Sequence, residues 1–154
     1  MVIRNFARYL YALINGNSNV DMETESGAVY NFSASAVTTY LNNFASNSGV
    51  FFRIGTDSRK TVFEDKSLYS AISSGYTSGA KSAVNGDGIR TLTQTFMATT
   101  DLVINEVGLS FNVGTRSFCI VRISTSDTDE SGNAVFTQIK VNAGDTFTIS
   151  MVIG

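Results

Sequence analysis

The stretch VNAGDTFTISMVIG (residues 141–154) joins a turn to the clearest strand pattern in the chain. Residues 142–145 have the Asn, Gly and Asp that turns favour. After them, apolar side chains alternate with hydroxyl-bearing ones, which is the period of a strand with one buried face; the apolar positions are Phe147, Ile149, Met151 and Ile153. The stretch therefore predicts a half-buried β-strand.

The region 89–154 repeats this alternation in further short segments. Their apolar positions are Leu92, Phe96, Val103, Val107, Leu109, Phe111, Phe118, Ile120, Val135, Ile139 and Val141. Five strands at short spacing, joined by Gly, Asn and Asp turns, are typical of an antiparallel sheet folded into a sandwich. We therefore predict a mainly β protein, an antiparallel β-sandwich of jelly-roll-like type, with an N-terminal helix and one further short helix.

The two helices are predicted from three- and four-residue spacings. Residues 2–15 carry one apolar stripe (Val2, Ile3, Phe6, Tyr9, Leu10, Leu13 and Ile14) opposite Arg4, Asn5, Arg8 and Asn15, with Gly16 as a stop. Residues 33–47 place Val37, Tyr40, Leu41 and Phe44 on one face. The first helix either covers the core of its own domain or docks on a neighbouring subunit.

The length of 154 residues suits one domain with its own core. We expect a single domain, 1–154, made of the N-terminal helix (1–16), a mixed strand, helix and loop region (27–88) and the antiparallel β core (89–154). Residues 15–27 are expected to be a polar connection. The segment 57–75 is expected to be an irregular but packed crossing, with a flexible Gly and Ser turn region at 75–82.

Composition argues against several functions. Only 16% of residues are charged and the net charge is −2, so nothing suggests a nucleic-acid partner. No apolar stretch approaches the ~18 residues of a membrane span, and we expect an intracellular product without a cleaved leader. Cys119, the one cysteine, lies in an alternating run and is expected to be a buried filler. The chain has no Pro, which leaves strand edges without a usual block against pairing.

Catalytic groups are scarce. Because the chain has no His, it has no Ser-His or Cys-His pair and no histidine metal ligand. The neighbouring acids Glu64 and Asp65, and Asp129 and Glu130, are expected to be solvated. GYTSGAKS (residues 75–82) has the wrong spacing for a phosphate loop. We predict no enzyme activity, no catalytic residues and no cofactor.

DTDESGN (residues 127–133) begins like a calcium loop, with oxygen-bearing residues at alternate positions and Gly132 at the sharp turn. The closing position is Gln138, where calcium needs a bidentate Glu, and the flanks alternate like strands. We therefore predict a polar hairpin loop and no metal site. In the nearby strand, Glu106 is expected either to face solvent or, as we prefer, to pair with an arginine such as Arg122.

Three segments together resemble a known group of proteins. These are RIGTDSRKTVFEDKSL (53–68), LTQTFMATTDLVINEVGLSF (92–111) and VNAGDTFTISMVI (141–153). In this order and spacing they resemble small structural proteins encoded among the virion genes of tailed bacteriophages, over about residues 49–154. The chain departs from that pattern in the loop after Thr56, which lacks the expected prolines, and at Ser110-Phe111, where an aromatic such as Tyr would follow the Gly-Leu pair.

The resemblance implies a non-enzymatic virion component, assembled in the host cytoplasm, and we expect a capsid auxiliary or decoration protein that stabilises the head. A tail or fibre component is the first alternative, and a ligand- or glycan-binding β-sandwich module the second. The expected partners are the major capsid protein or tail proteins, with homo-oligomers expected and neither nucleic acid nor membrane.

Interface side chains are expected at the N-terminal helix, which has no acid before Asp21. Its aromatic and arginine residues are of the kind enriched at protein interfaces. The candidate docking residues are Arg4, Arg8, Tyr9 and Tyr11.

Overall fold

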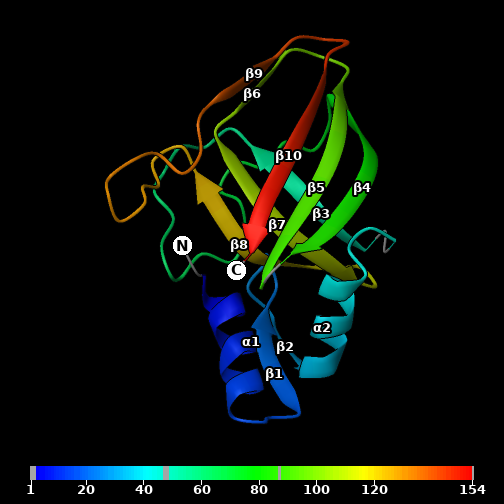
Figure 1. Ribbon diagram of the computed structural model, residues 1–154, viewed down its shortest axis with the longest axis vertical. Coiled ribbons are helices and arrows are strands. Elements are labelled where there is room, and N and C mark those ends of the chain that lie inside the picture. Colours follow the sequence, from blue (N-terminus) through cyan, green and yellow to red (C-terminus); the bar gives the residue numbers. More distant parts are fainter. Residues whose placement is uncertain (1–2, 47–48, 87, 154) are drawn as a thin grey trace.

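The computed structural model describes residues 3–46, 49–86 and 88–153, and its fold is mainly β (Figure 1). Its helices are α1 (Arg4–Ile14) and α2 (Ala34–Asn42). Its strands are β1 (Asn19–Glu23), β2 (Val29–Ser33), β3 (Val50–Gly55), β4 (Tyr76–Gly86), β5 (Ile89–Ala98), β6 (Leu102–Ile104), β7 (Glu106–Val113), β8 (Arg116–Ser124), β9 (Ile139–Val141) and β10 (Thr146–Ile153).

Two three-stranded antiparallel sheets form the sandwich. Their strand orders are β10-β5-β4 and β3-β7-β8. The β1–β2 ribbon lies between α1 and α2 at one end of the molecule, and the β6–β9 ribbon lies at the other end (Figure 1). This arrangement confirms the predicted antiparallel sandwich with its N-terminal helix and one further short helix.

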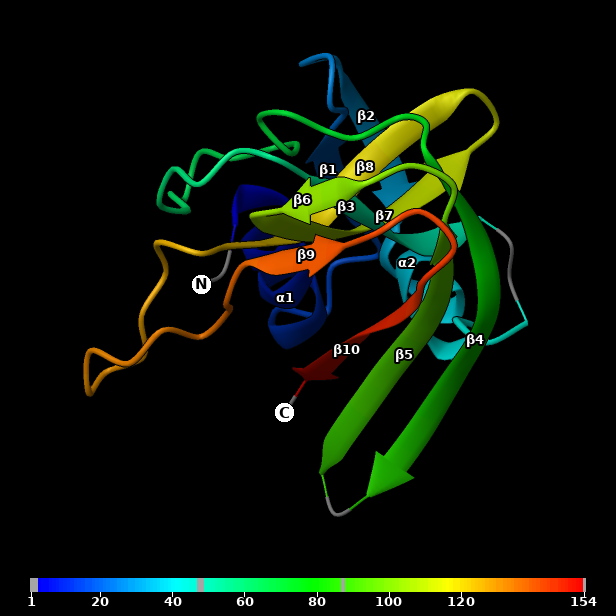
Figure 2. The ribbon, with the colours of Figure 1, turned by 90° about the horizontal axis from the view of Figure 1, so that it is seen from above.

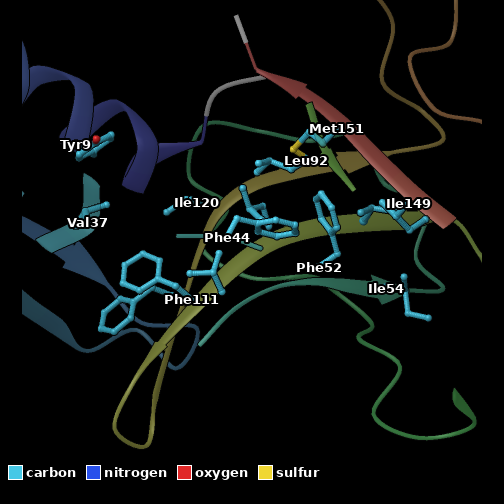
Figure 3. Packing of buried hydrophobic residues seen from close by; sticks show 14 of the residues in the cluster. Tyr9, Val37, Phe44, Phe52, Ile54, Leu92, Phe111, Ile120, Ile149 and Met151 are labelled. Atoms are coloured by element: carbon cyan, nitrogen blue, oxygen red, sulfur yellow. The ribbon is translucent and has the colours of Figure 1, made fainter. Parts of the chain in front are cut away.

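The core lies between the two sheets. Phe96 on β5 and Phe52, Phe111 and Phe118 on the other sheet are fully or almost fully buried. Figure 3 shows Leu92, Ile149 and Met151 of the β10-β5-β4 sheet in one cluster with Phe52 of the other sheet. In β10, Ile149 and Met151 are buried while Thr148 and Ser150 are exposed, so the predicted alternation is confirmed.

Two strands lie where none was predicted. Asn19–Glu23, expected to be part of a polar connection, is β1, and its alternate residues Val20 and Met22 are buried. Tyr76–Gly86, which contains most of the expected flexible turn region, is the 11-residue strand β4. Most side chains of β4 are exposed, so its sequence does not alternate between apolar and polar residues. Apolar periodicity therefore could not predict this strand. The sheets therefore also require β3 and β4 from outside the predicted 89–154 core.

Cys119 is fully buried in β8, as predicted. Burial raises the pKa of its thiol to about 12, because the thiolate would lose its hydration inside the sandwich. The reactive thiolate is therefore scarce at neutral pH and is also inaccessible.

We expect the native protein to react with a thiol reagent far more slowly than the protein in denaturant, by more than about a hundredfold. The measurement is the rate of absorbance change with a chromogenic disulfide at pH 8. The denatured protein is the control for intrinsic reactivity, and equal rates in the two states would contradict the buried position.

Candidate functional site

A buried amide on helix α1 binds backbone groups of β1 and β8. The Nδ2 of Asn5 donates to the carbonyls of Glu23 (2.7 Å) and Cys119 (2.9 Å), and its Oδ1 accepts from the Glu23 N–H (2.8 Å). Asn5 was predicted on the solvent side of the helix, but it is 1% exposed. Its burial costs little because backbone groups of β1 and β8 satisfy the amide.

The four predicted docking residues have different environments. Arg4 is half-buried and forms an ion pair with Glu23 (3.4 Å). Arg8 is also half-buried and lies against β1, with Nη1 3.5 Å from the Asp21 carbonyl. Tyr9 is buried, and its hydroxyl lies 2.8 Å from the Thr38 hydroxyl of α2. Only Tyr11 presents most of its side chain to solvent.

The buried face of α1 is rotated from the predicted stripe toward Asn5, Tyr9 and Ala12. This rotation leaves four large apolar residues on the last turns of the helix exposed. We call them the α1 apolar patch: Leu10 (36% exposed), Tyr11 (65%), Leu13 (46%) and Ile14 (82%). Their three- and four-residue spacings make them neighbours on the helix surface. The C-terminal end of α1, which carries the patch, lies at the end of the molecule opposite the β6–β9 ribbon (Figure 1).

Two hollows flank the α1 apolar patch. One, of about 490 Å³, lies between α1 and β1 and has Tyr11 in its wall. The other, of about 570 Å³, lies between α1 and the start of α2 and has Leu13 in its wall. Exposed apolar side chains beside hollows are the form of surface that receives side chains from a protein partner.

A buried charge network lies on the face of the β3-β7-β8 sheet that is turned away from the core between the two sheets. The guanidinium of Arg122 on β8 is fully buried and donates to Glu106 Oε2 on β7 (2.8 Å) and to Asp65 Oδ2 (3.1 Å). It also donates to the Arg59 carbonyl (3.0 Å) and lies 4.6 Å from the Tyr69 ring centroid. The predicted ion pair between Glu106 and Arg122 is confirmed.

The network fastens the irregular segment 56–75 to the sheet. Glu106 accepts from the backbone N–H groups of Tyr69 (3.1 Å) and Ser70 (2.7 Å). Asp65 accepts from the Val62 N–H (3.0 Å) and the Tyr69 hydroxyl (2.8 Å). Every oxygen of these two carboxylates is therefore occupied by a donor. The expectation that Asp65 is solvated is wrong, because it is one of the carboxylates that neutralise Arg122.

The segment 56–75 in turn holds the start of α1. The Phe63 carbonyl accepts a hydrogen bond from the Arg4 N–H (2.7 Å). Lys66 pairs with Glu23 (3.0 Å), the same carboxylate that Arg4 contacts. The hydrogen bond from Lys66, with the charge of Arg4, lowers the pKa of Glu23 below its ordinary value and so favours the ionised carboxylate. The direction of α1 is thus set by contacts that begin at the charge network.

Close approach of the backbone to this network requires glycine at one position. A Cβ on Gly55 would lie 2.7 Å from the Ser70 carbonyl and would also collide with the Glu106 carboxylate. Gly55 therefore lets the end of β3 lie against the carboxylate that binds residues 69 and 70.

The calcium-like segment forms no open ligand set. Both oxygens of Asp127 are used, by the Thr61 N–H (2.8 Å), the Thr61 hydroxyl (2.5 Å) and the Ser124 N–H (2.9 Å). Asp129 accepts from the N–H groups of Ser131 and Asn133 within its own turn, and these bonds lower its pKa. Gln138 donates to Asn105 instead (2.8 Å). Among the described residues, no group of three or more acidic, Cys or His side chains could hold a metal.

Comparison of the chain with protein-family models, with curated proteins and with solved structures finds no match. Within residues 3–46, 49–86 and 88–153, neither helix is long and apolar enough to cross a membrane. The α1 apolar patch, with the two hollows beside it, is the candidate site that the geometry provides.

Replacement of Arg122 by Met should destabilise the fold strongly. The change keeps most of the side-chain volume but leaves Glu106 and Asp65 buried without their cation, which costs roughly 3–5 kcal/mol of unfolding free energy. The measurement is urea denaturation followed by circular dichroism. Arg59→Met is the matched control, because Arg59 also lies over the Tyr69 ring and pairs with a carboxylate, yet its side chain is largely exposed. Equal losses in the two variants would contradict a structural role for the network.

Excess calcium should leave the melting temperature unchanged, because the Asp127 oxygens and Gln138 are already committed to protein partners. The measurement is calorimetry with calcium chloride against the chelated protein. Asp129→Ala is the informative variant, since Asp129 is exposed and Asp127 is not. A rise of several degrees with calcium that Asp129→Ala abolishes would show that a metal site exists.

Proposed function

We propose that this protein is a non-enzymatic structural component of a tailed-phage virion, and that it decorates or reinforces the head by docking through the α1 apolar patch. The observation that carries the proposal is the exposure of Leu10, Tyr11, Leu13 and Ile14 on one helix end. A helix needed only to cover its own core would bury such side chains. The resemblance over residues 49–154 to phage virion proteins supports the class of assembly.

The rest of the molecule is suited to carrying such a docking element. The sandwich has a continuous core, and the segment 56–75 that holds α1 is fastened by buried ion pairs. A rigid body limits the conformational entropy lost on binding. Many copies, each burying several hundred Å² on a capsid surface, would together raise the stability of the shell.

Tail or fibre proteins remain the alternative hosts for the same docking element. The α1 apolar patch requires an apolar protein surface as its partner and does not distinguish a capsomer from a tail subunit. The host assembly is therefore an outcome of the experiment below, in which heads and tails are separated before the protein is quantified.

Replacement of Tyr11 by Ala together with Ile14 by Ser should reduce incorporation into particles without unfolding the protein. Both side chains are mostly exposed, so the melting temperature should stay close to that of the unmodified protein. Loss of two interface anchors should lower the amount bound at limiting concentration by about tenfold or more. The measurement is mass-spectrometric quantification of the protein in purified heads and tails, after complementation of a phage that lacks the gene.

Val84→Ser on β4 is the matched control, because Val84 is 64% exposed and apolar but lies outside α1. Full incorporation of Val84→Ser beside poor incorporation of the α1 variant supports docking through the patch. Normal incorporation of the α1 variant would refute it. Absence of the unmodified protein from both heads and tails would refute the virion proposal itself.

A further inference from the structure

An apolar cleft runs along the free edge of β10. The cleft has a volume of about 420 Å³. Five consecutive residues of β10, numbers 148–152, line one side of it, and they come from both faces of the strand. Residues of both faces can line one cleft only where it opens onto the edge of the strand. The opposite wall consists of Val107, Ile123, Val135, Phe136 and Ile139. The cleft therefore exposes backbone, with apolar side chains around it.

The backbone groups at this edge can be assigned from the register. The Asp145 carbonyl accepts from the Ala98 N–H, so it points toward β5 (2.9 Å). Because N–H and C=O directions alternate along a regular strand, the groups of Thr148, Ser150 and Val152 point away from β5 and into the cleft. Among the described residues, β10 pairs with β5 alone (Figure 2).

The edge of β3 is closed by the chain itself. Its Phe52 N–H donates to the Gln94 side chain of β5 (2.8 Å), and its Val50 carbonyl accepts from Lys81 of β4 (2.6 Å). The Ile54 carbonyl accepts from the Ile72 N–H (2.9 Å). This edge has no run of open backbone groups to offer another strand.

The remaining two sandwich edges are also obstructed. In β8, the carbonyls of Ser117 and Cys119 accept from the Glu25 N–H and the Asn5 side chain. In β4, the register shifts between Ser78 and Lys81, and such irregularity hinders pairing. β10 differs from these edges because it has a regular eight-residue register and no charged residue. It is the sandwich edge best suited to accept a strand.

A strand that fits this edge must meet two requirements. Its side chains on the core face must be apolar, because the cleft wall has no charged residue. Its side chains on the other face must suit an uncharged surface, since the outward residues of β10 and β5 there are Thr91, Thr93, Thr95, Met97, Thr146, Thr148, Ser150 and Val152. β10 itself has this alternation. A second copy therefore meets both requirements and brings no like charge into the pair.

We propose that β10 pairs antiparallel with β10 of a second copy about a two-fold axis near Ser150. The axis places Ile149 of one copy opposite Met151 of the other and keeps the apolar face of each strand toward the cores. The sheet becomes continuous through both copies, in the order β4-β5-β10-β10-β5-β4. A stable interface buries roughly 800 Å² per partner, more than one strand edge supplies, so the cleft walls also take part.

This inference does not rest on the proposed function, because β10 and the α1 apolar patch are separate surfaces. The test is the oligomeric state of the purified full chain by sedimentation velocity over a range of concentrations. Two edge variants are compared with the unmodified protein: Ser150→Pro, which removes one N–H from the free edge and none from the β5 ladder, and Ser150→Lys with Val152→Lys, which adds charge to the edge.

The matched control is Thr93→Lys with Thr91→Lys. These residues lie directly opposite Ser150 and Val152 on the inner strand β5, and the control loses the same Thr93–Ser150 hydroxyl contact as the edge variants (3.1 Å). We expect the unmodified protein and the control to dimerise, and both edge variants to raise the dimer dissociation constant by about tenfold or more with unchanged circular dichroism.

Three results would overturn the inference. One is an unmodified protein that stays monomeric at every concentration. If the edge variants of such a monomer also failed to enter particles, β10 would instead bind a different protein. Another is a dimer that the edge variants leave intact. The third is equal weakening by the edge variants and the β5 control. Tyr11→Ala with Ile14→Ser should leave the dimer unchanged, so failure of α1 docking and failure of β10 pairing are distinguishable.

Discussion

The ion pair between Arg122 and Glu106 is the contact on which the conformation of residues 56–75 depends. It joins neighbouring strands β7 and β8 at full burial, and both of its members reach further groups of the segment 56–75. That segment has little regular structure, so it cannot hold its shape through a hydrogen-bond ladder of its own. Its backbone is instead bound by carboxylates and a guanidinium that project from the sheet.

The energetic role of this network differs from that of the core. Burial of charges costs free energy, and ion pairing with additional hydrogen bonds offsets that cost without a large surplus. Apolar burial between the sheets supplies the net stabilisation. The network favours one arrangement of residues 56–75, since any other would leave some of the donors of Arg122 and some of the carboxylate oxygens of Glu106 unpaired inside the protein. Through the Phe63 carbonyl and Lys66 it also selects the position of α1.

The predictable parts of the structure are those in which one residue pattern determines one environment. The alternation in β10, the burial of Cys119 and the Glu106–Arg122 pair follow from local periodicity and from the cost of an unpaired charge in a strand.

β4 and the buried Asn5 could not be predicted in this way. An exposed strand lacks apolar alternation, and an amide becomes a core group only when backbone of other elements surrounds it. Asp65 and Asp127 stand in polar segments of the sequence, and their burial depends on partners 57 and 66 residues away. The exposure of the α1 apolar patch could not be predicted for the same reason. Periodicity defines an apolar stripe, but the burial of Asn5 leaves part of that stripe facing solvent.

The two proposed contact surfaces differ in what they demand of a partner. The α1 apolar patch offers side chains beside hollows, so its affinity depends on the shape of the surface it meets. The β10 edge offers backbone groups and uncharged side chains, which any strand of similar alternation can satisfy, including β10 of a second copy. Pairing through β10 would place two α1 patches on one rigid body. Two weak sites held at a fixed separation bind a repeating surface far more tightly than either alone, provided that the repeat matches the separation. If both proposals hold, self-pairing through the β10 backbone would strengthen recognition through the side chains of the α1 apolar patch.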